Sequence, residues 1–329
     1  MPSGLLIRLR PAGPWRIGPD SGDRDRVDRI FHSDSLFSAI SAAMSRLGTL
    51  EEWLDATVRA PEPAVRFSSC FPFQGDTLFV VPPRNLWPPP PSSKVRWKGA
   101  RFVPLSVVET LVSGHPIAEE GWMIDGASEC LAPLGGSGPL RVSVRSSAAV
   151  DRWGGAVAPH SSACLEFAPL AGLWMAAAFA DGAACERWLQ PLTGALRLLA
   201  DSGFGGERSL GWGSSEMPEI LQGNLPDLVL KNGDHSASSA YWMLSLFHPS
   251  VSDSVDWQQG NYTLTTRGGR VENTGDPKKP TRMIAEGSVL VAASEPRGSA
   301  TDVAPENSPH PVYRAGFALA VPIPWRHAP

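Results

Sequence analysis

The chain has 329 residues, of which 42% are hydrophobic and 19% charged, so it has the balance of a folded globular protein with room for two domains. Its formal charge of −4 excludes a surface covered in positive charge, and any contact with nucleic acid must be local. Glycine and proline number 32 each, which indicates many turns between short strands and predicts a sheet-based fold.

Cysteine usage and the amino terminus bear on the compartment. Four cysteines stand far apart, at positions 70, 130, 164 and 185, without the pairing of a disulfide framework or a zinc site, which fits a reducing cytosol. The first thirteen residues hold a short apolar stretch broken by Arg8 and Arg10, so we expect no signal peptide and no membrane contact. The histidines are scattered and no cofactor motif is present. We therefore expect a cytoplasmic protein without metal or cofactor.

The first part of the chain predicts strands and one helix. Residues 5–10 alternate in polarity with period two, as in a strand with one buried face, and residues 36–47 place apolar side chains at helical spacing. Ser33 or Asp34 is expected to cap that helix. A short strand pair is predicted within residues 66–81.

The middle of the chain holds a proline run, a helix and an arginine-bearing strand. Residues 82–91 are rich in proline and cannot enter a central ladder, so we expect a surface loop or arm. Ser106 and Glu109 form a capping-box pattern for a helix that ends near Gly114. Residues 140–145 alternate again and carry arginine outward, as in a half-exposed strand.

A second strand and helix follow, and then a series of strands. Residues 173–179 are typical of a buried strand and residues 188–199 of a helix, with Pro191 limiting where its regular part begins. Residues 294–311 are expected to form a mobile excursion. Four further strands are predicted, at residues 241–247, 262–266, 287–292 and 316–323.

The order of these elements predicts the topology. Strand, helix, strands, helix, strand is the order of a ferredoxin-like (RRM-like) domain, and the chain has room for two. We therefore predict an α+β fold with two such domains, residues 1–215 and 216–329, although no exact sequence repeat supports a duplication.

A glycine-rich loop at residues 203–213 is the strongest local feature. Its glycines follow a helix and precede a strand, which is the reverse of a dinucleotide fingerprint, and no Gly-Lys-Ser/Thr ending of a phosphate loop is present. Gly205 and Gly206 would let main-chain amides approach an RNA phosphate or sugar, with Arg208 and Ser209 beside them. A merely tight turn is the alternative.

His32 stands at the start of the first helix, in the sequence Phe31-His32-Ser33-Asp34. One interpretation is an ordinary helix start in which Asp34 favours the dipole and His32 orders the preceding loop. The other makes His32 a general acid or base for RNA cleavage, or makes His32 and Ser33 contacts to a nucleotide docked at the helix terminus.

Three basic clusters contain or adjoin aromatic residues, a combination that suits single-stranded RNA because phosphates pair with cations while bases stack on rings. For any one cluster a solvated face is the alternative. The clusters are Lys94, Arg96, Lys98 and Arg101 around Trp97; Arg141, Arg145 and Arg152 near Trp153; and Arg267, Arg270, Lys278, Lys279 and Arg282.

Taken together these segments resemble the RAMP superfamily of CRISPR proteins, and within its Cas-five group the family of subunit four of type III-A Csm effector complexes. The likeness spans nearly the whole chain and rests on the number and order of its pieces. These are Phe31 to Ala39, Phe71-Pro72-Phe73 with Pro82-Pro83, Lys94 to Lys98, Val144-Arg145 with Asp151-Arg152, the glycine-rich loop, Ser245 to Pro249, Arg267-Gly268-Gly269, Glu286 to Val289 and Tyr313 to Gly316.

The resemblance implies two ferredoxin-like domains with a projecting thumb hairpin, here residues 141–160, and places the family's RNA track in the glycine-rich loop. It implies a subunit without nuclease activity that binds the 5′ tag of the guide RNA (crRNA) in antiviral defence. The expected partners are that RNA, the large polymerase-like subunit, the backbone RAMP subunit and, indirectly, the target RNA.

Two alternatives stay open at this point. One is a guide-processing endoribonuclease of the same superfamily, with His32 as acid or base and Arg208 stabilising the phosphorane. The other is the equivalent subunit of another type III complex.

Overall fold

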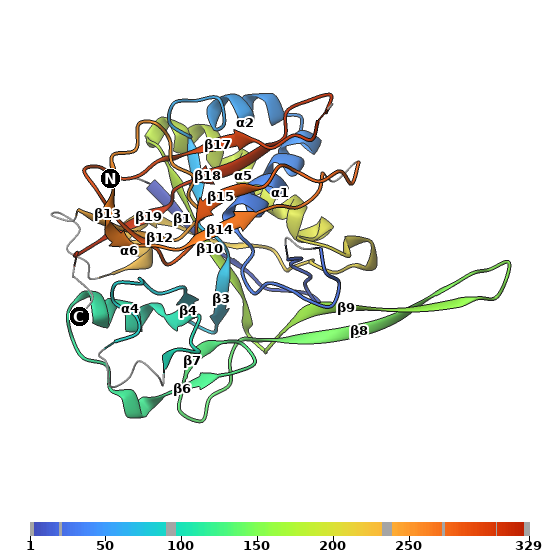
Figure 1. Cartoon of the computed structure of the whole chain (residues 1–329), viewed down its shortest axis with the longest axis horizontal. Coiled ribbons are helices and arrows are strands. Elements are labelled where there is room, and N and C mark those ends of the chain that lie inside the picture. Colours follow the sequence, from blue (N-terminus) through green and yellow to red (C-terminus); the bar gives the residue numbers. More distant parts are fainter. Residues whose placement is uncertain are drawn as a thin grey trace.

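The computed structural model describes residues 3–19, 22–89, 97–231, 239–271, 274–306 and 308–325. Its larger sheet has seven strands in the order β11-β1-β10-β3-β4-β5, with β2 also paired to β10 (Figure 1). The strands are β1 Ser3–Leu9, β2 Val65–Phe67, β3 Phe71–Gln74, β4 Thr77–Val80, β5 Val103–Pro104, β10 Ala171–Phe179 and β11 Glu219–Asn224. These confirm the strands predicted at residues 5–10, within 66–81 and at 173–179. β11 pairs with β1, so the larger sheet includes a strand from beyond residue 215.

Two long helices, α1 (Ser33–Arg46) and α5 (Gly182–Ser202), pack against one face of the larger sheet, and α2 (Leu50–Ala56) follows α1. Both long helices were predicted, and α5 accommodates Pro191 within it. The predicted cap of α1 is wrong, because His32 occupies that position and makes no side-chain cap bond. Ser33 and Asp34 are not free to act as caps because they bond to groups far along the chain, as described below.

The helix predicted near residue 106 is α4 (Leu105–Val112), but its capping box is wrong. Pro104 is the N-cap residue, and no side chain caps the helix. The Glu109 carboxylate instead accepts a hydrogen bond from the main-chain N–H of Lys231 at 2.8 Å. The carboxylate thus ties α4 to the segment after α6 (Leu225–Val229).

The preceding proline segment forms a loop without strand pairing over its described part, as predicted, but it packs against the body and does not project as an arm. Pro82 and Asn85 are buried, and the Trp87 ring lies 6.0 Å from the Trp97 ring, centroid to centroid. Residues 90–96 lie outside the described residues.

The smaller sheet has four strands in the order β13-β16-β12-β19, and two hairpins accompany it. The predicted mobile excursion at 294–311 is wrong in part, since five of its residues form β17, paired in register with β18. The strands of the sheet are β12 Ala240–Met243, β13 Val255–Asn261, β16 Val289–Ala292 and β19 Ala320–Ile323. The first hairpin consists of β14 Leu264–Arg267 and β15 Thr281–Ile284, and the second of β17 Gly298–Asp302 and β18 Tyr313–Phe317.

The two sheets share one strand order. Four strands of the larger sheet, β1, β2, β10 and β11, form a set apart from the β3-β4-β5 extension. Numbered first to fourth along the chain, they lie side by side in the order fourth, first, third, second. The strands β12, β13, β16 and β19 repeat this order, and every pairing is antiparallel. The difference is in the connections, because α1 and α5 join strands of the larger sheet, whereas hairpins and loops do so among the described residues of the smaller one.

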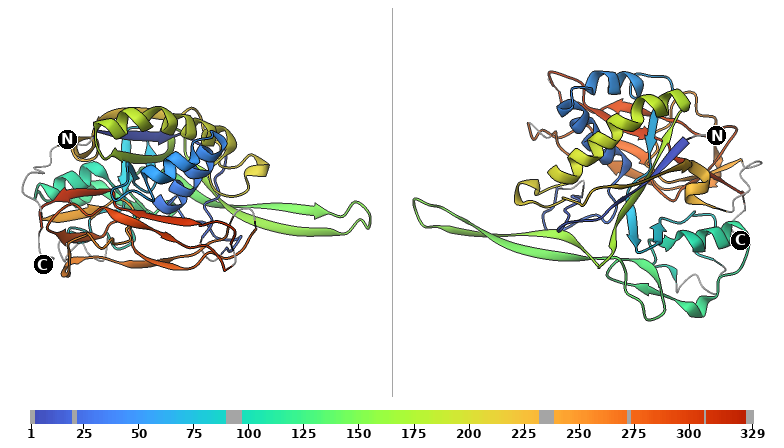
Figure 2. Two further views of the ribbon diagram at one scale, coloured as in Figure 1. Left: turned by 90° about the horizontal axis from the view of Figure 1, so that it is seen from above. Right: turned by 180° about the vertical axis from the view of Figure 1, so that it is seen from behind.

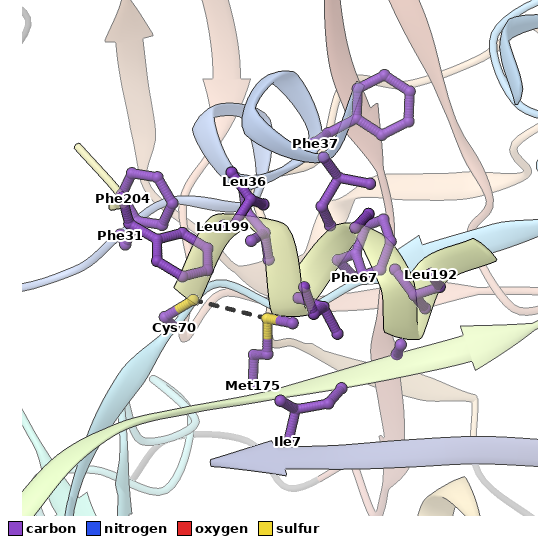
Figure 3. Close-up of a cluster of buried hydrophobic side chains, with 14 of the residues drawn as sticks. Ile7, Phe31, Leu36, Phe37, Phe67, Cys70, Met175, Leu192, Leu199 and Phe204 are labelled. Carbon is purple, nitrogen blue, oxygen red and sulfur yellow. Dashed lines mark hydrogen bonds between the residues drawn. The ribbon is translucent and has the colours of Figure 1, made fainter. Parts of the chain in front are cut away.

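Two apolar cores lie on opposite faces of the larger sheet. Figure 3 shows part of the first, in which Phe31 and Phe204 lie together near Cys70 and Met175. The second core joins the other face of the larger sheet, through Trp174, to the smaller sheet. The larger sheet is therefore buried between the helices and the smaller sheet, which holds both halves of the chain as one body.

A long hairpin leaves this body. β8 (Leu140–Val150) and β9 (Val157–Phe167) pair along their whole length and project away from the sheets (Figures 1 and 2). The prediction of a strand at 140–145 is confirmed, but Val142 and Val144 are exposed as well as the arginines, because both faces of the projecting hairpin meet solvent. A smaller hairpin, β6 (Trp122–Asp125) with β7 (Cys130–Pro133), lies near α4. Among the helices described, none is long and apolar enough to span a membrane.

Candidate nucleic-acid interface

A groove of about 520 Å³ lies where the first turns of α1, the glycine-rich loop and the hairpins of the smaller sheet meet. Of the ionisable side chains that line it, apart from His32, seven are cations and one, Asp34, is a carboxylate, a net charge of 7 − 1 = +6. In a chain of net charge −4 this is a strong local concentration of positive charge. The cations are Arg16, Arg46, Arg208, Arg267, Arg270, Lys278 and Arg314.

The glycine-rich loop forms one wall of the groove and is held rigidly. Gly205 has φ +76°, in the left-handed region, and a Cβ there would lie 2.3 Å from the carbonyl oxygen of Arg16. Between the glycines, Phe204 enters the core and stacks on Trp15 at 5.1 Å. The amide of Gly206 donates to Arg16 O at 2.8 Å, so this amide is used within the protein, and contact between the loop and RNA stays a prediction. The glycines serve close packing of the loop against the segment at Trp15 and Arg16.

Arg16 connects this wall to the projecting hairpin. Its guanidinium donates to three carbonyl oxygens, those of Asp23 at 2.8 Å, Arg24 at 2.8 Å and Ala163 in β9 at 3.0 Å. The side chain is 7% exposed. One buried arginine therefore holds together the glycine-rich loop, the loop after β1 and the base of the hairpin. Sequence patterning gave no signal for it, because its partners are carbonyl groups.

The floor of the groove is a buried ion cluster. Arg267, at the end of β14, donates to both carboxylate oxygens of Asp34, through Nε at 3.1 Å and Nη2 at 3.0 Å. Arg314, in β18, donates to the same carboxylate and to Gly268 O. Burial would raise the pKa of Asp34, but the two arginines outweigh it and lower the pKa to about 2. Two cations face one anion, so the floor keeps a positive charge.

His32 lies beneath this floor between two carboxylates. Its Nδ1 is 2.7 Å from Glu286 Oε1, and its Nε2 is 3.1 Å from Asp28 Oδ2. Burial would lower the pKa of His32, but the carboxylates of Glu286 and Asp28 raise it to about 9. Both ring nitrogens of the imidazolium are therefore engaged. This geometry favours the predicted ordering role of His32 and gives no support to acid–base chemistry.

The remaining predicted contacts are distributed unevenly. Ser33 is buried, and its hydroxyl accepts from Leu246 N at 3.0 Å. Arg270 lines the groove and donates to Gly275 O at 2.8 Å. Arg208 also lines the groove, whereas Ser209 is exposed beside it in a single 3-10 turn. Lys98 is exposed away from the groove, and Lys94 and Arg96 lie outside the described residues.

The hairpin carries the second basic cluster. Arg141 and Arg145 both bind Glu166 on the paired strand, at 3.0 and 2.7 Å, which arranges them in a row along one face. Arg152 and the fully exposed Trp153 occupy the tip. The arrangement offers cations along the shaft and one aromatic ring at the end.

Known proteins match the chain at two levels. Residues 236–323 match the family model described as the CRISPR Csm4 C-terminal domain. The curated relative "CRISPR system Cms protein Csm4" of Thermococcus onnurineus (strain NA1) is 33% identical over 91 residues. That alignment covers 27% of this chain and spans about a quarter of the relative, 26% of its length.

Solved structures extend the likeness to the whole fold. A chain of the Csm3-Csm4 subcomplex in the type III-A CRISPR-Cas interference complex matches with a TM-score of 0.67 at 17% identity, covering 97% of this chain and 99% of that one. A chain of the Csm1-Csm4 cassette in complex with cA4 matches with a TM-score of 0.61 at 20% identity, covering 99% of this chain and 100% of that one. At these identities the likeness is one of fold.

Proposed function

We propose that the chain is a Csm4-type RAMP subunit of CRISPR systems, because residues 236–323 match the model of the Csm4 C-terminal domain, and that it binds the 5′ tag of the guide RNA in the basic groove. The observation that carries the proposal is the net charge of +6 on a groove formed by the glycine-rich loop and both halves of the chain. An anionic strand is the ligand that such a groove fits.

The fold proposal is two ferredoxin-like domains, residues 1–215 and 216–329, with β8–β9 as the thumb hairpin. The shared order fourth, first, third, second in both sheets supports it, because this is the strand order of that fold. The pairing of β11 with β1 supports a refinement in which the first domain extends through Asn224, so that β11 is its fourth strand.

RNA recognition in this proposal rests on charge and shape. Arg208, Arg270 and Arg46 would contact phosphates along the groove, while Arg267 and Arg314 hold the floor positive. The row of arginines on the hairpin continues the cationic surface, and Trp153 at its tip is free to stack on a base. Base pairing elsewhere in the guide would read the target sequence.

We propose that the subunit acts without catalysing RNA cleavage. The nuclease alternative requires His32 to exchange protons with RNA, but its ring is 9% exposed and lies between Glu286 and Asp28. Purified protein incubated with precursor guide RNA should leave the RNA intact. Site-specific cuts that disappear in His32→Ala would overturn this part of the proposal.

The proposed setting is a type III-A effector complex in the cytoplasm, where the subunit bridges the large polymerase-like subunit and the backbone RAMP subunit. The matched folds come from a Csm3-Csm4 and a Csm1-Csm4 complex, which supports both partnerships. Another type III complex remains the alternative setting. Identifying the co-purified subunits and sequencing the bound RNA separates the two.

The decisive experiment measures RNA binding at several salt concentrations. The double variant Arg208→Ala, Arg270→Ala should bind a tag oligonucleotide more weakly, and its salt slope should fall by about 0.7 for each phosphate that the variant no longer neutralises. Arg187→Ala is the matched control, because Arg187 lies on α5 outside the groove and pairs with Glu52. Equal affinity and slope in the double variant and the wild type would refute the groove assignment.

A further inference from the structure

A second groove, of about 550 Å³, lies between α4 and α6 and crosses β11, β1 and β4. We call it the β11 groove. It lies on the face of the larger sheet opposite α1 and α5, because Leu6 lines it while Leu5 and Ile7 point into the helical core. In Figure 1, α4 and α6 are at the left, whereas the β8–β9 hairpin projects to the right. The two grooves thus serve different sides of the molecule.

The β11 groove combines an apolar floor with an open strand edge. Leu221 in β11 is 59% exposed, and Met217 just before the strand is 67% exposed. β11 ends the strand order of the larger sheet, and no other described strand pairs with its outer side. Its sequence has neither proline nor lysine, two devices that protect edge strands from pairing. A long exposed edge beside exposed leucine is typical of a place where another chain adds a strand.

The net charge of the β11 groove indicates which kind of partner it fits. Four carboxylates and two cations line it, a net charge of 2 − 4 = −2, against +6 in the RNA groove. An RNA strand would be repelled here, whereas lysine or arginine side chains would be attracted. The carboxylates are Asp76, Glu109, Glu219 and Asp227, and the cations are Arg8 and Lys231.

Resting on the proposed function, we propose that the β11 groove docks an extended segment of the large partner subunit, which pairs with β11 and alternates apolar with basic side chains. Apolar side chains would pack on Leu221, which shares the face of Leu6, and basic ones would meet Asp227 and join Arg10 at Glu219. In the proposed assembly the RNA groove and the hairpin would face the backbone subunit. The opposite side is left for the large subunit.

The first test uses the assembled complex purified through this chain. Leu221→Asp, and separately the pair Glu219→Lys, Asp227→Lys, should reduce co-purified large subunit at least tenfold while guide RNA and the backbone subunit are retained. Leu134→Asp is the control, since Leu134 is 69% exposed and does not line the groove. Full retention of the large subunit in both variants, or loss of the backbone subunit in its place, overturns the proposal.

A second measurement does not depend on the complex. An octapeptide alternating valine and lysine, labelled with a fluorophore, should bind the isolated chain, and a valine–glutamate octapeptide should bind much more weakly. Leu221→Asp should weaken the valine–lysine peptide at least fivefold, and Leu134→Asp should leave it unchanged. Equal binding by both variants overturns the docking site even if the chain's RNA role is upheld. Failure of the RNA role alone would appear as unchanged salt slopes in the groove arginine variants.

Discussion

The buried His32 should make the stability of the fold depend on pH in the alkaline range. In the folded chain His32 lies between Glu286 and Asp28, and its pKa is raised to about 9, whereas an unfolded chain leaves it at the ordinary value of about 6.5. The folded state binds this proton more tightly. The stabilisation is therefore fully present below about pH 6.5 and is lost as pH rises through about 9.

The magnitude follows from the two pKa values. A difference of about 2.5 units at about 1.4 kcal/mol per unit gives about 3 kcal/mol. This is a large share of the 5–15 kcal/mol typical of a folded domain. The measurement should stop near pH 9. Burial raises the pKa of Cys70 in the folded chain, so above that pH the thiol ionises in the unfolded chain and lowers the stability of the fold a second time.

The assay is denaturant unfolding of the wild type and of His32→Gln at intervals from pH 6 to pH 9. The difference in unfolding free energy between them should shrink by about 3 kcal/mol across this window. His115→Gln is the control, since His115 is exposed and takes no part in the contacts of His32 with Glu286 and Asp28. A wild-type minus His32→Gln difference that stays constant with pH would refute the assigned role of the imidazolium.

Three further predictions concern the groove and the hairpin. Gly205→Ala and Gly213→Ala should each lower the unfolding free energy by more than about 2 kcal/mol, because the added Cβ would lie 2.3 Å from a carbonyl oxygen at position 205 and 2.0 Å from one at position 213. Gly211→Ala is the control, since no atom would lie near its Cβ, and it should lower the unfolding free energy by about 1 kcal/mol. Asp34→Asn should cost about 3–5 kcal/mol, since it leaves two buried arginines without a countercharge, and a change under 1 kcal/mol in chemical denaturation would contradict the ion-cluster assignment. Trp153→Ala should leave the thermal midpoint unchanged but weaken guide RNA binding by about 1–3 kcal/mol, and equal RNA affinity would remove the ring from the RNA path.

Local patterns in the sequence predicted the elements whose partners are local or apolar. The alternation at residues 5–10 marked β1, and the spacing of apolar residues marked α1 and α5. The glycines of the 203–213 loop marked a real structural requirement, because several have left-handed φ angles in the fold. Their predicted contact with RNA stays a prediction, and the amide of Gly206 is used within the protein.

The parts that could not be predicted depend on contacts between distant positions. Asp34 meets Arg314 across 280 positions in the sequence, and Arg16 meets Ala163 across 147. Ser33 and Asp34 were predicted as helix caps from their local sequence, but both side chains bond to distant residues and do not cap the helix. Of the hairpins that replace helices as connections in the smaller sheet, β14 was predicted as a strand, but its pairing with β15 and the strand β17 were not.

The attachment of the β8–β9 hairpin gives it the mechanics of a lever. Arg16 holds β9 at Ala163, six positions from Val157 at the far end of the strand, so the hairpin extends roughly 20 Å beyond this attachment at its base. Arg16 fastens that base to the glycine-rich loop through Ala163 O and its own carbonyl. A displacement of about 3 Å at the tip then corresponds to a rotation of roughly 9° about this attachment, given strands of this rise. A displacement of the tip by a neighbouring molecule would therefore reach the wall of the basic groove as a much smaller movement.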